Sequence, residues 1–88
     1  MNKNYKGSKE KVKNPGELKG TFFNTGKDPR FKNAKLYFQD MQWGEFSFGQ
    51  THHVNTYHGH EWNVRDPDGN ILKKWTVAAA PDKQEFRV

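Results

Sequence analysis

Residues 61–77 read EWNVRDPDGNILKKWTV. The first five of these residues alternate polar and apolar side chains with a period of two, which is typical of a half-buried β-strand. Asp66-Pro67-Asp68-Gly69 follows as a strong turn signal, because proline fits the second position of a turn and glycine tolerates a positive φ. A second β-rich run occupies residues 71–77. The segment therefore predicts a β-hairpin.

Five further short runs predict strands on either side of this hairpin. They cover residues 21–24, 35–41, 45–48, 52–57 and 85–88. Short strands at this spacing, without a convincing helical period, favour an all-β fold, namely a small antiparallel β-sandwich of about seven to eight strands. The side chains expected in its core are Phe22, Leu36, Phe38, Phe46 or Phe48, Val54, Trp62, Val64, Trp75, Val77 and Phe86.

Length and composition limit the chain to one small domain. It has 88 residues, of which 32% are hydrophobic and 15% are aromatic, so the core is expected to consist of few, large side chains. Cysteine is absent, which excludes a disulfide framework, a thiolate zinc site and a cysteine nucleophile. No apolar run approaches the roughly 20 residues of a membrane helix, and no secretory signal is visible. We therefore expect a cytoplasmic protein with no membrane partner.

The positive charge is concentrated near the N-terminus. Residues 1–20 hold six lysines and two glutamates, a net charge of +4, whereas residues 21–88 carry only +1 of the total of +5. This composition predicts a flexible, disordered lysine-rich arm over residues 1–19 and a folded domain over 20–88. The arm is either a solubilising tail or a segment that contacts phosphates or another acidic surface.

All four histidines lie within residues 52–60, which raises the question of a metal site. His52 and His53 point to opposite faces of a strand, so only one of them can join a given site. His58 and His60 flank Gly59 as a weak chelating pair, but a third ligand is not evident. We expect neither a metal site nor a cofactor.

Thr56, His60 and Trp62 suggest a binding surface instead. They supply a hydroxyl, an imidazole and an indole face at even-numbered positions within seven residues. If the chain is extended on both sides of Gly59, they line one concave patch that suits a small apolar ring with one polar group. Burying an unpaired hydroxyl costs roughly 1–3 kcal/mol, so such a patch would select for that polar group.

Residues 56–66, TYHGHEWNVRD, resemble the central motif of the von Hippel–Lindau tumour suppressor β domain family. That motif reads Ser-Tyr-Arg-Gly-His-x-Trp, followed by an apolar strand and Arg-Asp. A weaker similarity extends over residues 20–88, at positions 22–24, 35–41 and 48–49. The resemblance implies a β-sandwich of seven or eight strands that binds peptides containing 4-hydroxyproline.

The resemblance also implies roles for individual residues. Thr56 and His60 would hydrogen-bond the hydroxyl of the hydroxyproline, and Trp62 would form the wall of the ring pocket. Asn55 stands where the family has a histidine that helps to bind the peptide backbone.

Two further pocket positions follow from a gapped alignment with the family. Tyr37 matches the family's second pocket tryptophan, and Phe46 stands where the family has a pocket tyrosine. At Phe46 one hydroxyl contact would be missing. Because no helical segment follows before Val88, we expect no assembly with elongin or cullin.

These observations favour a non-catalytic module that binds a proline- or hydroxyproline-containing peptide or protein. The alternative is a basic β module that binds nucleic acid or another polyanion through the lysine-rich arm, and it is less favoured because the folded part is nearly neutral. An enzyme is disfavoured because Glu61 and His60 are neighbours on a strand and point apart. Asp66 and Asp68 belong to a turn, so we expect no catalytic residues.

Overall fold

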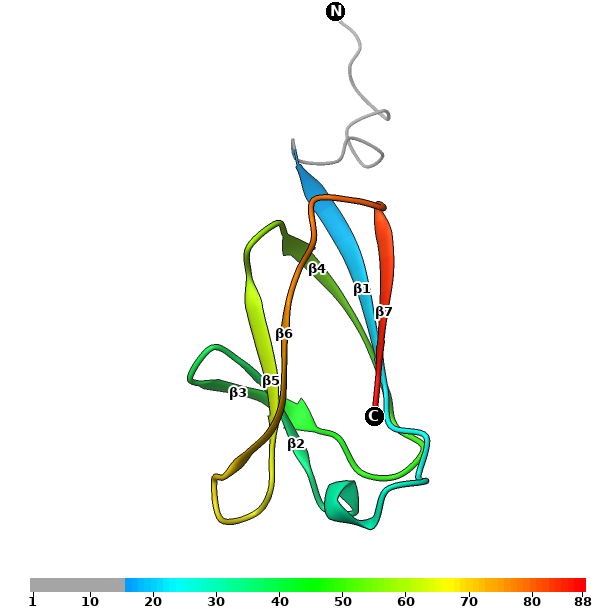
Figure 1. Ribbon diagram of the computed structural model, residues 1–88, viewed down its shortest axis with the longest axis vertical. Coiled ribbons are helices and arrows are strands. Elements are labelled where there is room, and N and C mark those ends of the chain that lie inside the picture. The colour runs from blue at the N-terminus through cyan, green and yellow to red at the C-terminus, as the bar shows by residue number, and fades with distance from the viewer. Residues whose placement is uncertain (1–15) are drawn as a thin grey trace, which may run out of the picture.

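The chain folds into two β-sheets that pack face to face in a computed structural model, which describes residues 16–88 (Figure 1). Sheet A contains, in spatial order, β4 (Thr51–Tyr57), β1 (Glu17–Phe23) and β7 (Lys83–Arg87). Sheet B contains β3 (Met41–Glu45), β2 (Lys35–Phe38), β5 (Glu61–Arg65) and β6 (Ile71–Thr76). One 3₁₀ turn, η2 (Pro29–Phe31), joins β1 to β2. The predicted all-β class is confirmed.

The hairpin of residues 61–77 is present as β5 and β6. The two strands pair antiparallel, with Trp62 opposite Trp75. In the turn, the carboxylate of Asp66 accepts hydrogen bonds from the backbone nitrogens of Asp68 and Asn70, at 3.0 and 2.9 Å. Gly69 takes a φ of +89°, a backbone conformation that residues with a side chain rarely adopt.

Protonation of Asp66 is expected to weaken this turn. Hydrogen bonds from the Asn70 side chain and then from the Asn70 backbone hold the pKa of the Asp66 carboxyl below its usual value. The unfolded chain therefore takes up the proton first, so the contribution of Asp66 to stability is present above about pH 4. It is lost as the pH falls through the depressed pKa of the folded state.

Denaturant unfolding at a series of pH values tests this prediction. Asp66→Asn should be less stable than the unaltered chain at neutral pH and should lose part of its acid sensitivity. Asp68→Asn removes the same charge from the same turn but leaves the hydrogen bonds that Asp66 accepts. An Asp66→Asn variant that kept the full acid sensitivity of the unaltered chain would contradict the role assigned to the Asp66 carboxylate.

Strand β1 begins at Glu17, inside the segment assigned to the arm, so the predicted domain boundary at residue 20 is wrong. Leu18 is only 4% exposed, because it alternates with Gly20 and Phe22 on the side of β1 that faces the core. The rest of the predicted arm, residues 1–15, lies outside the described residues. Strand β1 also runs parallel to β7, whereas the sequence predicted antiparallel pairing throughout the sandwich.

The single strand predicted over residues 35–41 is wrong, because the chain turns back at Gln39 and Asp40 to form β2 and β3. Gln39 has a φ of +55°, which is rare for a residue with a side chain. Two side chains of β5 fix this turn, since Asn63 Nδ2 and Arg65 Nη2 donate to the Gln39 carbonyl at 2.8 and 3.1 Å. Strand β3 then ends at Glu45, where the sequence predicted a strand over 45–48.

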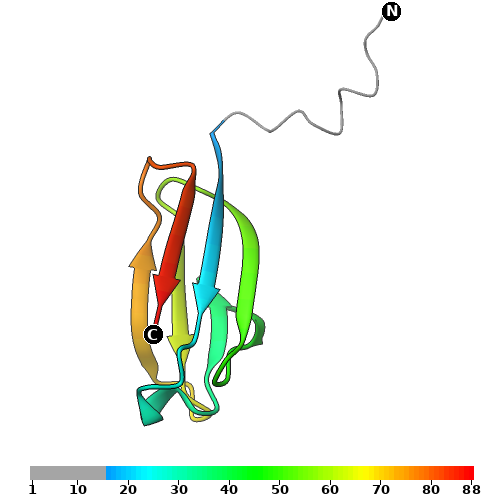
Figure 2. The same cartoon turned by 90° about the vertical axis from the view of Figure 1, so that its right-hand side faces the viewer.

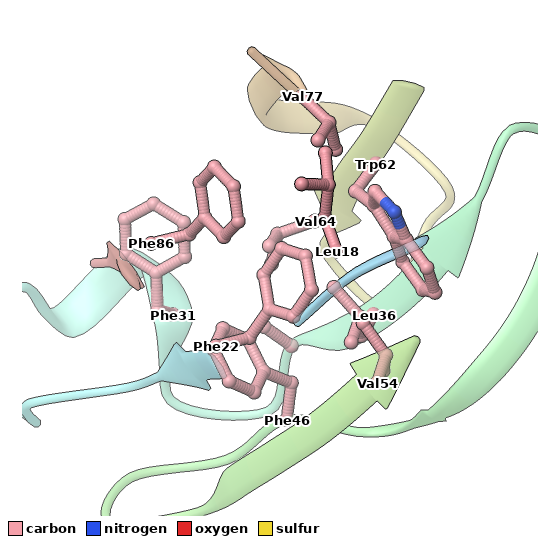
Figure 3. Close-up of a cluster of buried hydrophobic side chains, with 11 residues drawn as sticks. Leu18, Phe22, Phe31, Leu36, Phe46, Val54, Trp62, Val64, Val77 and Phe86 are labelled. Atoms are coloured by element: carbon pink, nitrogen blue, oxygen red, sulfur yellow. The ribbon is translucent and has the colours of Figure 1, made fainter. Parts of the chain in front are cut away.

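Large aromatic side chains fill the core between the sheets, as the composition predicted (Figure 3). The Phe22 ring lies 5.0 Å from the Trp62 ring and 4.7 Å from the Phe86 ring, measured between centroids. Of the two alternatives left open, Phe46 is buried and Phe48 is 41% exposed. Three buried hydrophobic residues were not expected, namely Leu18, Phe31 and Ala34. No helix within residues 16–88 has the length and apolar character to span a membrane.

Candidate functional site

Thr56, His60 and Trp62 meet where β4 of sheet A approaches the start of β5 in sheet B. The indole Nε1 of Trp62 donates to the Thr56 hydroxyl oxygen at 3.0 Å. The same oxygen lies 3.2 Å from Nδ1 of His60. The three polar groups therefore form one hydrogen-bonded network that ties the two sheets together.

Two members of this network are enclosed. Thr56 and Trp62 are each only 1% exposed, so the Thr56 hydroxyl, expected to contact a ligand, bonds to groups of the protein itself. His60 is half-buried. If Thr56 donates to Nδ1, the imidazole carries its hydrogen on Nε2, and this atom has no hydrogen-bond partner among residues 16–88. In that tautomer His60 offers a donor for a ligand.

A tight turn after β4 holds His60 in place. Gly59 adopts a φ of +88°, and its backbone nitrogen donates to the Val77 carbonyl at 2.9 Å. The Val77 nitrogen in turn donates to the His60 carbonyl at 2.9 Å, and the His60 nitrogen donates to the Tyr57 carbonyl at 3.1 Å. These backbone bonds fix the imidazole against the end of the hairpin.

Aromatic rings surround this polar network, and we call the five residues Phe38, Trp43, Tyr57, His60 and Trp62 the aromatic cluster. The Phe38 ring lies 5.0 Å from both His60 and Trp62, and the Tyr57 ring lies 5.5 Å from His60. Trp43 meets Trp62 at 5.1 Å with an interplanar angle of 78°, an edge-to-face contact. Trp43 and Tyr57 come from β3 and β4, which are edge strands of their sheets.

Trp43 is the exposed member of the aromatic cluster. It is 49% exposed, although its ring packs against the enclosed Trp62. It lies at the irregular point of the β2–β3 pairing, where Leu36 pairs with Gly44 but Tyr37 pairs with Gln42. This bulge is what inserts Trp43 as an extra residue between the paired positions.

The structure does not bring Tyr37 to the site. Phe38 and Trp62 are paired neighbours on one face of sheet B, so the alternation of side chains places Tyr37 on the opposite face. There the guanidinium carbon of Arg65 lies 4.1 Å from the centre of the Tyr37 ring. Tyr37, expected as a pocket residue, therefore lies on the face of sheet B opposite Phe38 and Trp62 and outside the aromatic cluster.

Phe46 and Asn55 also lie away from the aromatic cluster. Phe46 is 0% exposed in the core, so its ring cannot contact a ligand in this conformation, and its backbone nitrogen donates to the Ala34 carbonyl at 2.9 Å. Asn55 is exposed on the outer face of sheet A, where its side-chain oxygen accepts a hydrogen bond from the Lys19 ammonium at 2.7 Å. Neither residue takes part in the network of Thr56.

Sequence reasoning placed Phe38 in the core but did not single out Trp43. The available signal was that Gly44 follows Trp43, because a glycine within a strand often marks a bulge. In the fold, a side chain at Gly44 would place its Cβ 3.0 Å from the His52 ring. The imidazole of His52 occupies that space and bonds to the Glu45 carbonyl.

The remaining histidines do not gather around a common point. His53 bonds to Thr21 at 3.2 Å, and His58 is exposed in the turn after β4. Within residues 16–88, no three histidine, aspartate or glutamate side chains are arranged to hold a metal ion. In comparisons with known proteins, neither a protein-family model nor a curated protein matches this chain.

Proposed function

We propose that the domain is a non-catalytic peptide-binding module and that the aromatic cluster is its binding site. The ligand is a proline-containing segment, with 4-hydroxyproline preferred over proline. The motif of residues 56–66, with its resemblance to the von Hippel–Lindau β domain family, supports this choice of ligand.

The observation that carries the proposal is the exposure of Trp43. A tryptophan that is half exposed but backed edge-on by a second, enclosed tryptophan forms a rigid apolar surface. Aromatic surfaces of this kind dock proline-rich segments, whose extended conformation is largely formed before binding and so loses little entropy. Tryptophan is also among the residues that dominate binding energy at interfaces.

His60 provides a polar group for selectivity. Its ring contacts both Phe38 and Tyr57, so a ligand that stacks on these aromatics comes close to the imidazole. A ligand hydroxyl that pairs with Nε2 would gain a hydrogen bond, whereas an unhydroxylated proline would leave this nitrogen without a partner. A buried polar group without a partner costs roughly 1–3 kcal/mol, which is the scale of the expected preference.

The Thr56–His60 pair also has the residue types of a nucleophile and its base. Its surroundings argue against catalysis, because Thr56 is 1% exposed and its oxygen already accepts the indole hydrogen of Trp62. A nucleophile must reach its substrate, and a hydroxyl that is enclosed in this way does not. The pair is better suited to hold the cluster in shape.

Replacing Trp43 by alanine is expected to remove peptide binding while the domain stays folded. Because the side chain is half exposed, its loss should destabilise the fold by only about 1 kcal/mol. Affinity for a labelled proline-rich peptide, followed by fluorescence anisotropy, should fall at least about tenfold, as for a binding hot spot.

Phe48→Ala is the matched control for this experiment. Phe48 is an aromatic residue of similar exposure, 41%, but it packs near Gly26 and outside the aromatic cluster. Its replacement should leave the affinity unchanged. Equal losses of affinity in Trp43→Ala and Phe48→Ala would contradict the proposed site.

A further inference from the structure

The outer face of sheet A carries a groove that the peptide site does not use. Figure 2 shows this sheet facing the viewer, with β1 between β4 and β7. The groove has a volume of about 500 Å³ and follows β1. Its lining side chains include Lys19 and Thr21 from β1, His53 and Asn55 from β4, and Lys83 and Glu85 from β7.

Two lysines stand side by side at one end of this groove. Lys19 and Lys83 are paired neighbours across the parallel strands β1 and β7, and both are exposed. Like charges in this arrangement repel each other. The Lys19 ammonium turns toward β4 and donates to the side-chain oxygen of Asn55 at 2.7 Å, a neutral partner that does not cancel its charge. An anionic ligand between the two lysines would relieve the repulsion.

Neutral hydrogen-bonding groups form the middle of the groove. The Thr21 hydroxyl and the His53 imidazole lie 3.2 Å apart, and Asn55 lies beside them on β4. Hydroxyl, amide and imidazole groups all bond to phosphate and sugar oxygens in nucleic-acid complexes. They add polar contacts next to the charged end without adding negative charge.

A second, smaller hollow of about 170 Å³ continues the groove past Thr21. Phe23 and Arg87 line it, and the guanidinium carbon of Arg87 lies 5.8 Å from the centre of the Phe23 ring. An aromatic ring and a guanidinium are the groups on which unpaired bases stack. Among the described residues that line the two hollows, Glu85 is the one acidic side chain, and Arg87 pairs with it at 3.2 Å.

We propose that this face of sheet A binds single-stranded nucleic acid, independently of the peptide site. The phosphates lie between Lys19 and Lys83, and a base stacks on Phe23 and Arg87. Binding of this kind reads charge and ring faces rather than sequence. The lysines at positions 3, 6, 9, 11 and 13 precede β1 in the chain and raise its overall affinity for polyanions.

The alternative occupant of a basic groove is an acidic protein segment. A stable protein interface needs apolar anchors in its centre. In this groove the side chains are mainly charged or polar, and the aromatic ring at its end is covered on one side by a guanidinium. The chemistry of the groove therefore fits a polymer of phosphates and stacking bases better than a peptide.

The test is fluorescence anisotropy of a labelled deoxythymidine strand of about 12 nucleotides, titrated with the full chain at several salt concentrations. The double variant Lys19→Gln/Lys83→Gln should weaken binding at least about tenfold at low salt. Its salt dependence, as the slope of log K against log salt, should become shallower by about 1.4, since each lost phosphate contact contributes about 0.7.

Lys73→Gln/Lys74→Gln is the matched control. It removes the same charge with the same substitution, from exposed positions of β6 in sheet B, and should retain nearly the affinity of the unaltered chain. Equal weakening by both double variants would overturn the proposal, because net charge alone would then explain binding. Equally tight binding of a polyglutamate peptide of matched charge would also overturn it, in favour of an acidic protein partner. Circular dichroism checks that each variant is folded.

Discussion

Replacing Asn24 by alanine is expected to lower the free energy of unfolding by about 3 to 5 kcal/mol. Asn24 is fully buried at the end of β1, and its amide nitrogen donates to the carbonyls of Phe31 and Phe46 at 2.9 and 2.7 Å. Its amide oxygen accepts the Gly26 backbone hydrogen at 3.0 Å. Alanine would remove the Asn24 partner of the Phe46 carbonyl and of the Gly26 nitrogen, and it would leave the Phe31 carbonyl with only the 3.4 Å bond from the Ala34 nitrogen. Each buried polar group that loses its partner costs about 1–3 kcal/mol.

Asn24→Asp separates the hydrogen bonds from the volume of the side chain. Aspartate has nearly the same shape, but an ionised carboxylate cannot donate and would face two carbonyl oxygens. The free energy of unfolding of Asn24→Asp should fall at least as far as that of Asn24→Ala at neutral pH.

Asn33→Ala is the control, at an exposed asparagine in the neighbouring loop. It should change the free energy of unfolding by less than about 0.5 kcal/mol. Urea denaturation of the three variants measures these differences, and a stable Asn24→Asp variant would contradict the role assigned to Asn24.

Trp62→Ala is expected to be similarly severe, at about 3 to 5 kcal/mol, because it removes the largest fully buried side chain. The Trp62 ring contacts Phe22, Phe38 and Trp43, so its loss would open a cavity between the sheets and leave Trp43 without support. The substitution would also remove the hydrogen bond that the indole Nε1 of Trp62 donates to the Thr56 hydroxyl.

Trp75→Ala is the comparison for this variant. Trp75 lies directly opposite Trp62 in the β5–β6 hairpin, but it is only partly buried. Its replacement should therefore cost clearly less. Thermal unfolding followed by near-ultraviolet circular dichroism measures both losses. A loss for Trp75→Ala equal to that for Trp62→Ala would contradict the central packing role of Trp62.

The parts of the fold predicted from sequence are those with local causes. The β5–β6 hairpin follows from the alternation of residues 61–65 and the β-rich run of residues 71–77 on either side of a proline- and glycine-containing turn. In that turn Asp66 bonds to the backbone of its own loop. The burial of Phe22 and Trp62 follows from the same period of two. These features need no knowledge of distant residues.

The parts that were missed depend on contacts between distant residues. The turn at Gln39 contains no glycine or proline, and it is held by Asn63 and Arg65 from another strand. Leu18 stands in a lysine-rich context, and only its place between β4 and β7 makes it part of the core. Asparagine is typical of turns, but the Asn24 side chain donates to the carbonyls of Phe31 and Phe46, which are distant in the sequence.

The candidate site shows the same division. The motif of residues 56–66 named Thr56, His60 and Trp62, which lie together because a tight turn joins β4 to β5. The aromatic partners come from β2 and β3, whose register no local pattern revealed. That register places Phe38 beside Trp62 and Tyr37 on the opposite face, since a shift of one residue exchanges the two faces of a strand.

The most direct test of the proposed function is a ¹H–¹⁵N correlation titration of the full chain with two matched peptides, one containing proline and one containing 4-hydroxyproline. We expect shifts centred on the indole hydrogens of Trp43 and Trp62 and on the backbone of His60, at lower concentration for the hydroxylated peptide. The absence of shifts in the aromatic cluster with both peptides would contradict the account.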